Sequence, residues 1–134
     1  MKRTRLRRRK SLRRAGEKMP LKKRMDAMAK RLVLRRHGKA CLKCGSMRRV
    51  QASHVMPKGA HPSMRYDIDN IIPLCWACHF TWWHKSPLAA SGWFRQKFGN
   101  AAADILIVRA GSPGKVDLAL TRVWLEQELE KSGA

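Results

Sequence analysis

Four cysteines in two identical pairs constrain the fold of this 134-residue chain more than any other feature of its sequence. Cys41 and Cys44 form one Cys-x2-Cys pair, Cys75 and Cys78 form the other, and 30 residues lie between the pairs. Two thiolates with this spacing in a turn can face one point, and two such turns complete a tetrahedron of sulfur ligands around Zn²⁺. Because protein would then fill all four positions of the ion, we expect a structural zinc site.

Two disulfides are the alternative for these cysteines. Disulfides persist in oxidising compartments, but the basic N-terminus is not followed by the apolar stretch of a secretory signal. The longest apolar runs also fall far short of the roughly 20 residues that cross a bilayer. We therefore expect a cytoplasmic protein with reduced cysteines and no membrane partner.

Positive charge is concentrated near the N-terminus. The chain has 30 Lys and Arg against 9 Asp and Glu, and residues 1–36 hold 17 of these bases but only Glu17 and Asp26 as acids. Such an excess needs an anionic partner, and bases on a solvated arm bind phosphates by displacing counterions. An arm that only raises solubility is the alternative. The bases expected to contact nucleic acid here are Arg3, Arg5, Arg7, Arg8, Arg9, Arg13, Arg14, Lys22, Lys23 and Arg24.

The apolar pattern divides this basic region in two. Residues 1–19 have too few apolar side chains to bury, so we expect a disordered arm there. From Pro20 onward Leu21, Met25, Met28 and Leu32 recur at steps of four, three and four residues. That spacing predicts an amphipathic basic helix over residues 20–37, which packs on the following domain through its apolar stripe.

An ordered motif lies within and around the cysteine pairs. A His-x-x-Pro segment occupies residues 54–57, Asn70 follows it, and residues 74–79 read Leu-Cys-x-x-Cys-His. This arrangement resembles the HNH endonuclease family over about residues 41–84. The resemblance implies a small α+β protein with a ββα-metal core at residues 38–86, clamped by a four-cysteine zinc site and flanked by helices.

The same resemblance implies roles for individual residues. His54 matches the general base, Asn70 would orient its ring, and His79 matches the ligand of one catalytic divalent ion. A neutral imidazole with a pKa of about 6.5 can accept a proton at neutral pH, and a divalent ion can stabilise charge on a phosphate. Arg65 is a candidate clamp for that phosphate, and an ordinary surface arginine is the alternative.

One position departs from the family pattern. The residue before the base is usually an Asp or His that also binds the metal, but here it is Ser53, whose hydroxyl is a poor ligand. His84 is the nearest replacement in the sequence. Five residues correspond to about 140° around an α-helix, so His79 and His84 share a face only if the helix ends or distorts.

Residues 87–134 are expected to form a helical segment. Helices are predicted from about residue 100 to 109 and from residue 112 to about 131, with Asn100 and Ser112 near their starts. A group of aromatic residues is expected to pack in the core in preference to stacking on bases: Trp82, Trp83, Trp93 and Phe94.

The sequence therefore predicts a metal-dependent DNA endonuclease that nicks one strand of duplex DNA as a monomer. It would contain one structural Zn²⁺ and one catalytic Mg²⁺ or Mn²⁺. Resemblance to small free-standing HNH nucleases also implies a bacteriophage protein of the host cytoplasm, with packaging or recombination proteins as partners. A non-catalytic zinc-stabilised DNA-binding protein and an RNA nuclease or RNA-binding protein stay open as alternatives.

Overall fold

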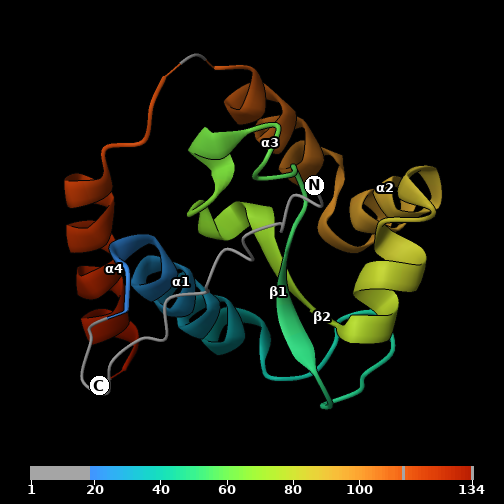
Figure 1. Ribbon diagram of the computed structural model, residues 1–134. Coiled ribbons are helices and arrows are strands. Elements are labelled where there is room, and N and C mark those ends of the chain that lie inside the picture. The colour runs from blue at the N-terminus through green and yellow to red at the C-terminus, as the bar shows by residue number, and fades with distance from the viewer. Residues whose placement is uncertain (1–18, 113, 134) are drawn as a thin grey trace, which may run out of the picture.

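The computed structural model describes residues 19–112 and 114–133. A two-stranded antiparallel sheet is flanked by helices (Figure 1), which confirms the expected α+β class. The main elements are α1 (Leu21–His37), β1 (Val50–His54), β2 (Ile71–Cys75), α2 (Pro87–Phe98), α3 (Asn100–Gly111) and α4 (Leu118–Ser132). Two 3₁₀ turns, Pro62–Met64 and Ile68–Asn70, precede β2, and a π-helix, Cys78–Trp83, follows it.

The two strands bring the separated parts of the motif side by side. Val50 lies opposite Cys75 and His54 lies opposite Ile71 in an antiparallel register. All five residues of β2 are buried, whereas β1 is mostly half-buried. A strand buried on both faces reads as a continuous apolar run, as residues 71–75 do.

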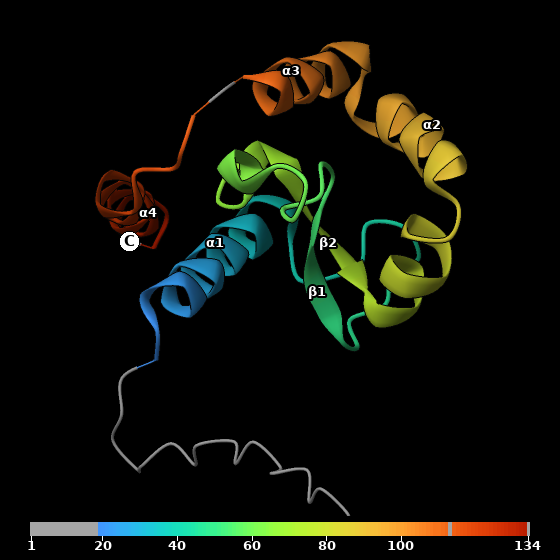
Figure 2. The same cartoon turned by 45° about the horizontal axis from the view of Figure 1, so that its top comes forward.

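One core lies between the sheet and α1. Met25, Ala29, Leu32 and Val33 of α1 are buried against a cluster that includes Ile71 of β2. The expected stripe is therefore confirmed for Met25 and Leu32, while Leu21 and Met28 lie at its edge and are half-buried. α4 packs beside α1 in both views (Figures 1 and 2).

A second core joins the sheet to the π-helix, α2 and α3. Its buried members include Ile72 and Leu74 of β2, Phe94 of α2 and Leu106 of α3. Trp83 is buried in this core, and Trp82 and Trp93 pack against it. The four aromatic residues expected to pack do so.

The C-terminal segment differs from the sequence prediction in two ways. Residues 87–98 form α2, a helix for which no bounds were predicted within the expected helical segment, with Pro87 in the first turn and Gly99 at the C-terminal end with φ of 91°. The last helix begins at Leu118, later than expected, because the Asp117 carboxylate accepts a hydrogen bond from the Leu120 N–H and caps it.

The basic arm lies outside this description. The seven arginines expected there to contact nucleic acid all fall within residues 1–18, which the structure does not describe. Lys22, Lys23 and Arg24 lie on α1, and all three are exposed. Within the described ranges, no helix combines the length and apolar character needed to cross a membrane.

Candidate active site

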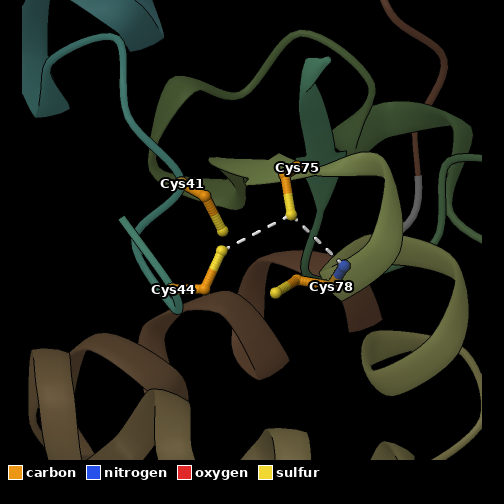
Figure 3. Close-up of side chains that lie close together, drawn as sticks. All are labelled: Cys41, Cys44, Cys75 and Cys78. Atoms are coloured by element: carbon orange, nitrogen blue, oxygen red, sulfur yellow. Dashed lines mark hydrogen bonds between the residues drawn. The ribbon is translucent and has the colours of Figure 1, made fainter. Parts of the chain in front are cut away.

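The four cysteines meet at one point. Cys41 and Cys44 follow α1, Cys75 ends β2, and Cys78 begins the π-helix. Figure 3 shows their sulfur atoms directed into a common space, and all four Sγ atoms lie within 4.8 Å of one another. The described cysteines are free thiols, so the disulfide alternative is not what the structure shows.

The cysteine geometry fits a tetrahedral metal site. The Sγ atoms of Cys44 and Cys75 are 3.6 Å apart. Zn–S bonds of about 2.3 Å place sulfur ligands roughly 3.8 Å apart along a tetrahedron edge, whereas a disulfide needs about 2.05 Å. The four side chains can therefore bind a structural metal such as zinc, which would hold the residues after α1 against the end of β2.

The backbone around the cysteines supports thiolate ligands. Gly45, with φ of 79°, closes the first turn and donates its N–H to the Cys41 carbonyl at 2.9 Å. Burial acts to raise the pKa of Cys41, but hydrogen bonds from the backbone N–H groups of Cys75, Cys44 and Lys43 outweigh it and lower that pKa to about 7. The Cys78 N–H points at the Cys75 sulfur, 3.4 Å away. These donors favour a thiolate at Cys41, whereas burial and the neighbouring sulfurs raise the pKa of Cys78, and the neighbouring sulfurs raise that of Cys44. A metal would therefore have to displace protons from those thiols when it binds.

His54 ends β1 with its imidazole held in one orientation. Its Nε2 donates a hydrogen bond to the Arg65 carbonyl oxygen at 2.8 Å, because a carbonyl can only accept. In the neutral ring this leaves Nδ1 unprotonated and able to take a proton. Burial lowers the pKa of His54 below its usual value, although the Arg65 carbonyl and the Asp26 charge partly oppose the shift. The ring is therefore neutral at pH 7.

Arg65, the candidate phosphate clamp, is paired with an acid in the structure. Its Nε and Nη2 donate to the two carboxylate oxygens of Asp26 at 2.9 and 2.6 Å, which forms a bidentate ion pair with α1. Burial acts to raise the pKa of Asp26, but the hydrogen bonds and charge of Arg65 outweigh it and lower that pKa. The pair anchors the residue whose carbonyl holds His54.

Asn70 also acts differently from the expectation that its amide would hold the His54 ring. Its Oδ1 accepts from the Met56 N–H at 2.7 Å, and its Nδ2 donates to the carbonyls of Met56 and Met64 at 3.0 and 3.1 Å. The fully buried amide therefore pins the two ends of the loop after β1. It orients His54 only indirectly, through the loop that also carries Arg65.

His79 and His84 lie side by side because the helix is distorted. The His84 N–H donates to the His79 carbonyl at 3.1 Å, the five-residue hydrogen bond of a π-helix. The two Nε2 atoms are consequently 2.9 Å apart. The sequence allowed these histidines to share a face only if the helix ended or was distorted, and it is distorted. Their Nε2 atoms can therefore act as neighbouring ligands of one ion.

Gln51 supports this pair, and sequence reasoning missed it. Its Oε1 accepts a hydrogen bond from His79 Nδ1 at 2.7 Å, which leaves the lone pair of His79 on Nε2, facing His84. A hydrogen bond to the second ring nitrogen is the usual support of a metal-binding histidine. Gln51 lies three residues before His54 on β1, and its residue type alone carries no signal of this role.

The three histidines line one cavity of about 660 Å³. Lys58 and Arg95 contribute positive charge to its wall, and apolar side chains of α2 and α3 complete it. None of the described Asp and Glu residues lines it. The cavity thus combines a neutral base, two nitrogen donors and cations, a combination suited to an anionic substrate.

One comparison with known families gives a match. Residues 41–81 match the family model described as HNH endonuclease. This part of the chain, under a third of its length, is similar to that family. Comparisons with curated proteins and with solved structures gave no match.

The strands, the helix and the cysteine group fit the ββα-metal core of HNH proteins. The family match ends at residue 81, before His84, and does not include α1, α2 or α3. Those helices nevertheless contribute the Asp26 carboxylate and part of the cavity wall. In this protein the surroundings of the HNH motif are therefore built largely by residues outside it.

Ser53 stands where HNH proteins usually have a metal ligand. Its side chain is fully buried, and its Oγ has no hydrogen-bond partner among the described residues. Ser53 is also not part of the cavity wall that contains His79 and His84. The structure therefore does not bring Ser53 to that pair, and the ligand set proposed below omits it.

Proposed function

We propose that this protein is a metal-dependent DNA endonuclease of the HNH type that nicks one strand. The observation that carries the proposal is the shared cavity in which His54, with Nδ1 free, lies with the paired Nε2 atoms of His79 and His84. The alternative is a zinc-stabilised DNA-binding protein without catalysis. Such a protein would not require His54 to be held in one tautomer.

Hydrolysis by this site follows from the positions of its own groups. His54 Nδ1 would accept the proton of a water molecule as that water attacks the phosphorus atom. The Arg65 carbonyl keeps Nε2 protonated, and Asn70 holds the loop in place. A divalent ion bound at His79 and His84 would stabilise the negative charge that develops on the phosphate and on the leaving oxygen. One base and one ion suit the cutting of one strand.

The ligands also narrow the choice of metal. Imidazole nitrogen favours first-row transition ions, whereas Mg²⁺ prefers oxygen ligands, and no described carboxylate lines the cavity. We therefore propose Mn²⁺ or a later first-row ion as the activator in preference to Mg²⁺.

The biological setting is proposed from the resemblance of residues 41–84 alone. We propose that this protein is encoded by a bacteriophage and acts as a monomer in the bacterial cytoplasm. Its partners would be proteins of DNA packaging or recombination. Duplex DNA would be held through the phosphate backbone by the N-terminal bases, because this is where the charge excess lies.

A plasmid assay tests the nuclease. With Mn²⁺ the protein should convert supercoiled plasmid to nicked circles, and His54→Ala should lower the rate by at least about 100-fold, as expected for loss of a general base. DNA affinity should stay within about twofold, because the change removes no phosphate-binding cation. His61→Ala is the matched control, since His61 lies in the same loop but does not line the cavity.

Equal nicking by His54→Ala and by the unaltered protein would overturn the assignment of the base. Binding without any nicking would favour the non-catalytic alternative. Faster cleavage of RNA of the same sequence would favour the RNA nuclease.

A further inference from the structure

Two aromatic side chains beside the histidine pair have no packing role that accounts for them. Trp76 is 47% exposed and Phe80 is 44% exposed, although both follow a fully buried strand. Their ring centroids are 5.4 Å apart with the rings tilted by 37°. They are thus adjacent rings on the outside of the helix, and we call them the aromatic shelf.

The shelf lies next to the groups proposed to act on the scissile phosphate. The Phe80 ring centroid is 5.0 Å from that of His79 and 5.7 Å from that of His84. Trp76 contacts Phe80, and in the sequence it lies between the zinc-site residues Cys75 and Cys78. A nucleotide chain with one phosphate at the histidine pair would therefore have a neighbouring nucleotide at the shelf.

Basic residues in the segments that adjoin the helix of the shelf suit nucleic acid. The backbone N–H of Trp76 donates to the Arg49 carbonyl at 2.9 Å, so the backbone of Arg49 lies beside that of Trp76. Arg48, Arg49 and Lys85 are exposed and form no ion pair with any acid of the described residues. The other exposed tryptophan, Trp124, lies on α4 in the same helix as Glu126 and Glu128.

An exposed aromatic face discriminates between forms of DNA. In a continuous duplex both faces of each base are covered by neighbouring bases, so a protein ring can stack only on a base that has lost a neighbour. In single strands, bulges and kinked steps this stacking is available and is tolerant of sequence.

We propose that Trp76 and Phe80 stack on an unpaired base next to the cleaved bond, so that the favoured substrate is DNA with an unpaired nucleotide at the cut. This inference rests on the proposed nuclease for its reaction, but the shelf itself is tested by affinity alone.

The test compares three DNA probes of one sequence: a single strand, a duplex with one bulged base, and a fully paired duplex. Binding of the zinc-loaded full chain is measured by fluorescence anisotropy without added divalent ion, so that the strands stay intact. Trp76→Leu and Phe80→Leu should each weaken binding to the single strand and the bulge about tenfold, as loss of one stacked base predicts. Affinity for the paired duplex should change less than twofold.

Matched variants separate stacking from general apolar contact. Trp76→Phe and Phe80→Trp keep a ring and should bind as the unaltered protein does. Trp124→Leu removes a tryptophan of similar exposure, 44%, on α4 and should leave all three affinities unchanged. If Trp76→Leu loses zinc, Phe80→Leu, which lies outside the cysteine pair, decides the question.

Fluorescence of 2-aminopurine at the bulge gives a direct signature, because stacking on a protein ring quenches it. Equal losses on paired and unpaired DNA, or no loss with either leucine variant, would overturn the shelf. If neither plasmid nor the bulged duplex is nicked with Mn²⁺ while unpaired probes still bind through the rings, the proposed nuclease is overturned and the shelf stands.

Discussion

The proton-accepting atom of His54 is determined by a single contact, from Nε2 to the Arg65 carbonyl. That carbonyl is held in turn by the bidentate pair of Arg65 with Asp26 on α1. Asp26 is one of only two acids in the first 36 residues, so an isolated carboxylate in a basic helix was a signal that sequence reasoning could have used. At the scale of residues, the site depends on a helix outside the HNH motif.

The pH dependence of nicking follows from His54. Because the base must be neutral and burial lowers its pKa, activity should persist below the pH of about 6.5 at which a free imidazole becomes protonated. It should fall only as the pH drops through that lower value. The negative charge of Asp26 raises the pKa of His54, so Asp26→Asn should move the acid limb of the rate profile to still lower pH.

The measurement is the single-turnover nicking rate between pH 5 and pH 8 at saturating Mn²⁺. The control is His61→Ala, whose rate should depend on pH as that of the unaltered protein does. An acid limb above pH 6.5, or one that Asp26→Asn moves upward, would contradict this account of the base.

At the scale of elements, the π-helix determines which histidines meet. Residues spaced by five diverge on an α-helix but coincide when the backbone hydrogen bond also spans five residues, as between His84 and His79. The Thr81 hydroxyl donates to the Ala77 carbonyl within the same turn, a contact typical of distorted helices. The helix thus brings together two imidazole nitrogens that we propose as metal ligands, where the strand offers only Ser53.

The hydrogen bond between Gln51 of β1 and His79 of this helix can be tested by substitution of Gln51. Gln51→Leu removes the acceptor for His79 Nδ1, so the ring can rotate and change tautomer. We expect the Mn²⁺ concentration for half-maximal nicking to rise roughly 10- to 100-fold, as for other supports of metal ligands. The maximal rate at saturating Mn²⁺ should fall less.

Titration of activity with Mn²⁺ gives the measurement, and Gln96→Leu on the exposed side of α2 is the control. An unchanged Mn²⁺ requirement in Gln51→Leu would show that the contact does not support metal binding.

At the scale of the molecule, the cysteine group joins segments that backbone hydrogen bonds from Leu42 to Pro73 and from Trp76 to Arg49 also connect. It connects the turn after α1 with the end of β2, and Cys41 and Cys75 belong to the core shared with α2 and α3. Few long apolar side chains hold residues 39–49 in place, so we expect a metal bound by the cysteines to stabilise this segment.

Removal of zinc should therefore unfold the HNH core. Structural Zn²⁺ contributes about 10–16 kcal/mol to folding in zinc-finger peptides, which exceeds the whole stability of many domains. Treatment with a zinc chelator, or Cys44→Ser, should abolish the cooperative thermal transition seen by circular dichroism. Re-addition of Zn²⁺ should restore it in the chelated protein but not in the variant, and a transition insensitive to zinc would contradict the structural role.

Several features follow from local sequence alone. The Cys-x2-Cys pairs indicated the metal site, the recurrence of apolar residues at steps of three and four indicated α1, and the order of His54, Asn70 and His79 indicated the HNH domain. The first two depend on spacing within a turn or a helix, and the third depends on resemblance to a known family. α2 was missed although Pro87 and Gly99 mark its ends, because Gly92 and its mixed faces weaken the helical pattern.

Only the tertiary structure decided how the histidines are held and which of them meet. The partner of Arg65 lies 39 residues away on α1, and Gln51 reaches His79 across 28 residues. The amide of Asn70 is committed to the loop backbone, not to His54. Contacts of this kind arise when packed elements bring distant side chains within hydrogen-bonding distance, and no local periodicity encodes them. The sequence by itself thus determined which chemical groups are present, and packing determined which of their atoms face one another.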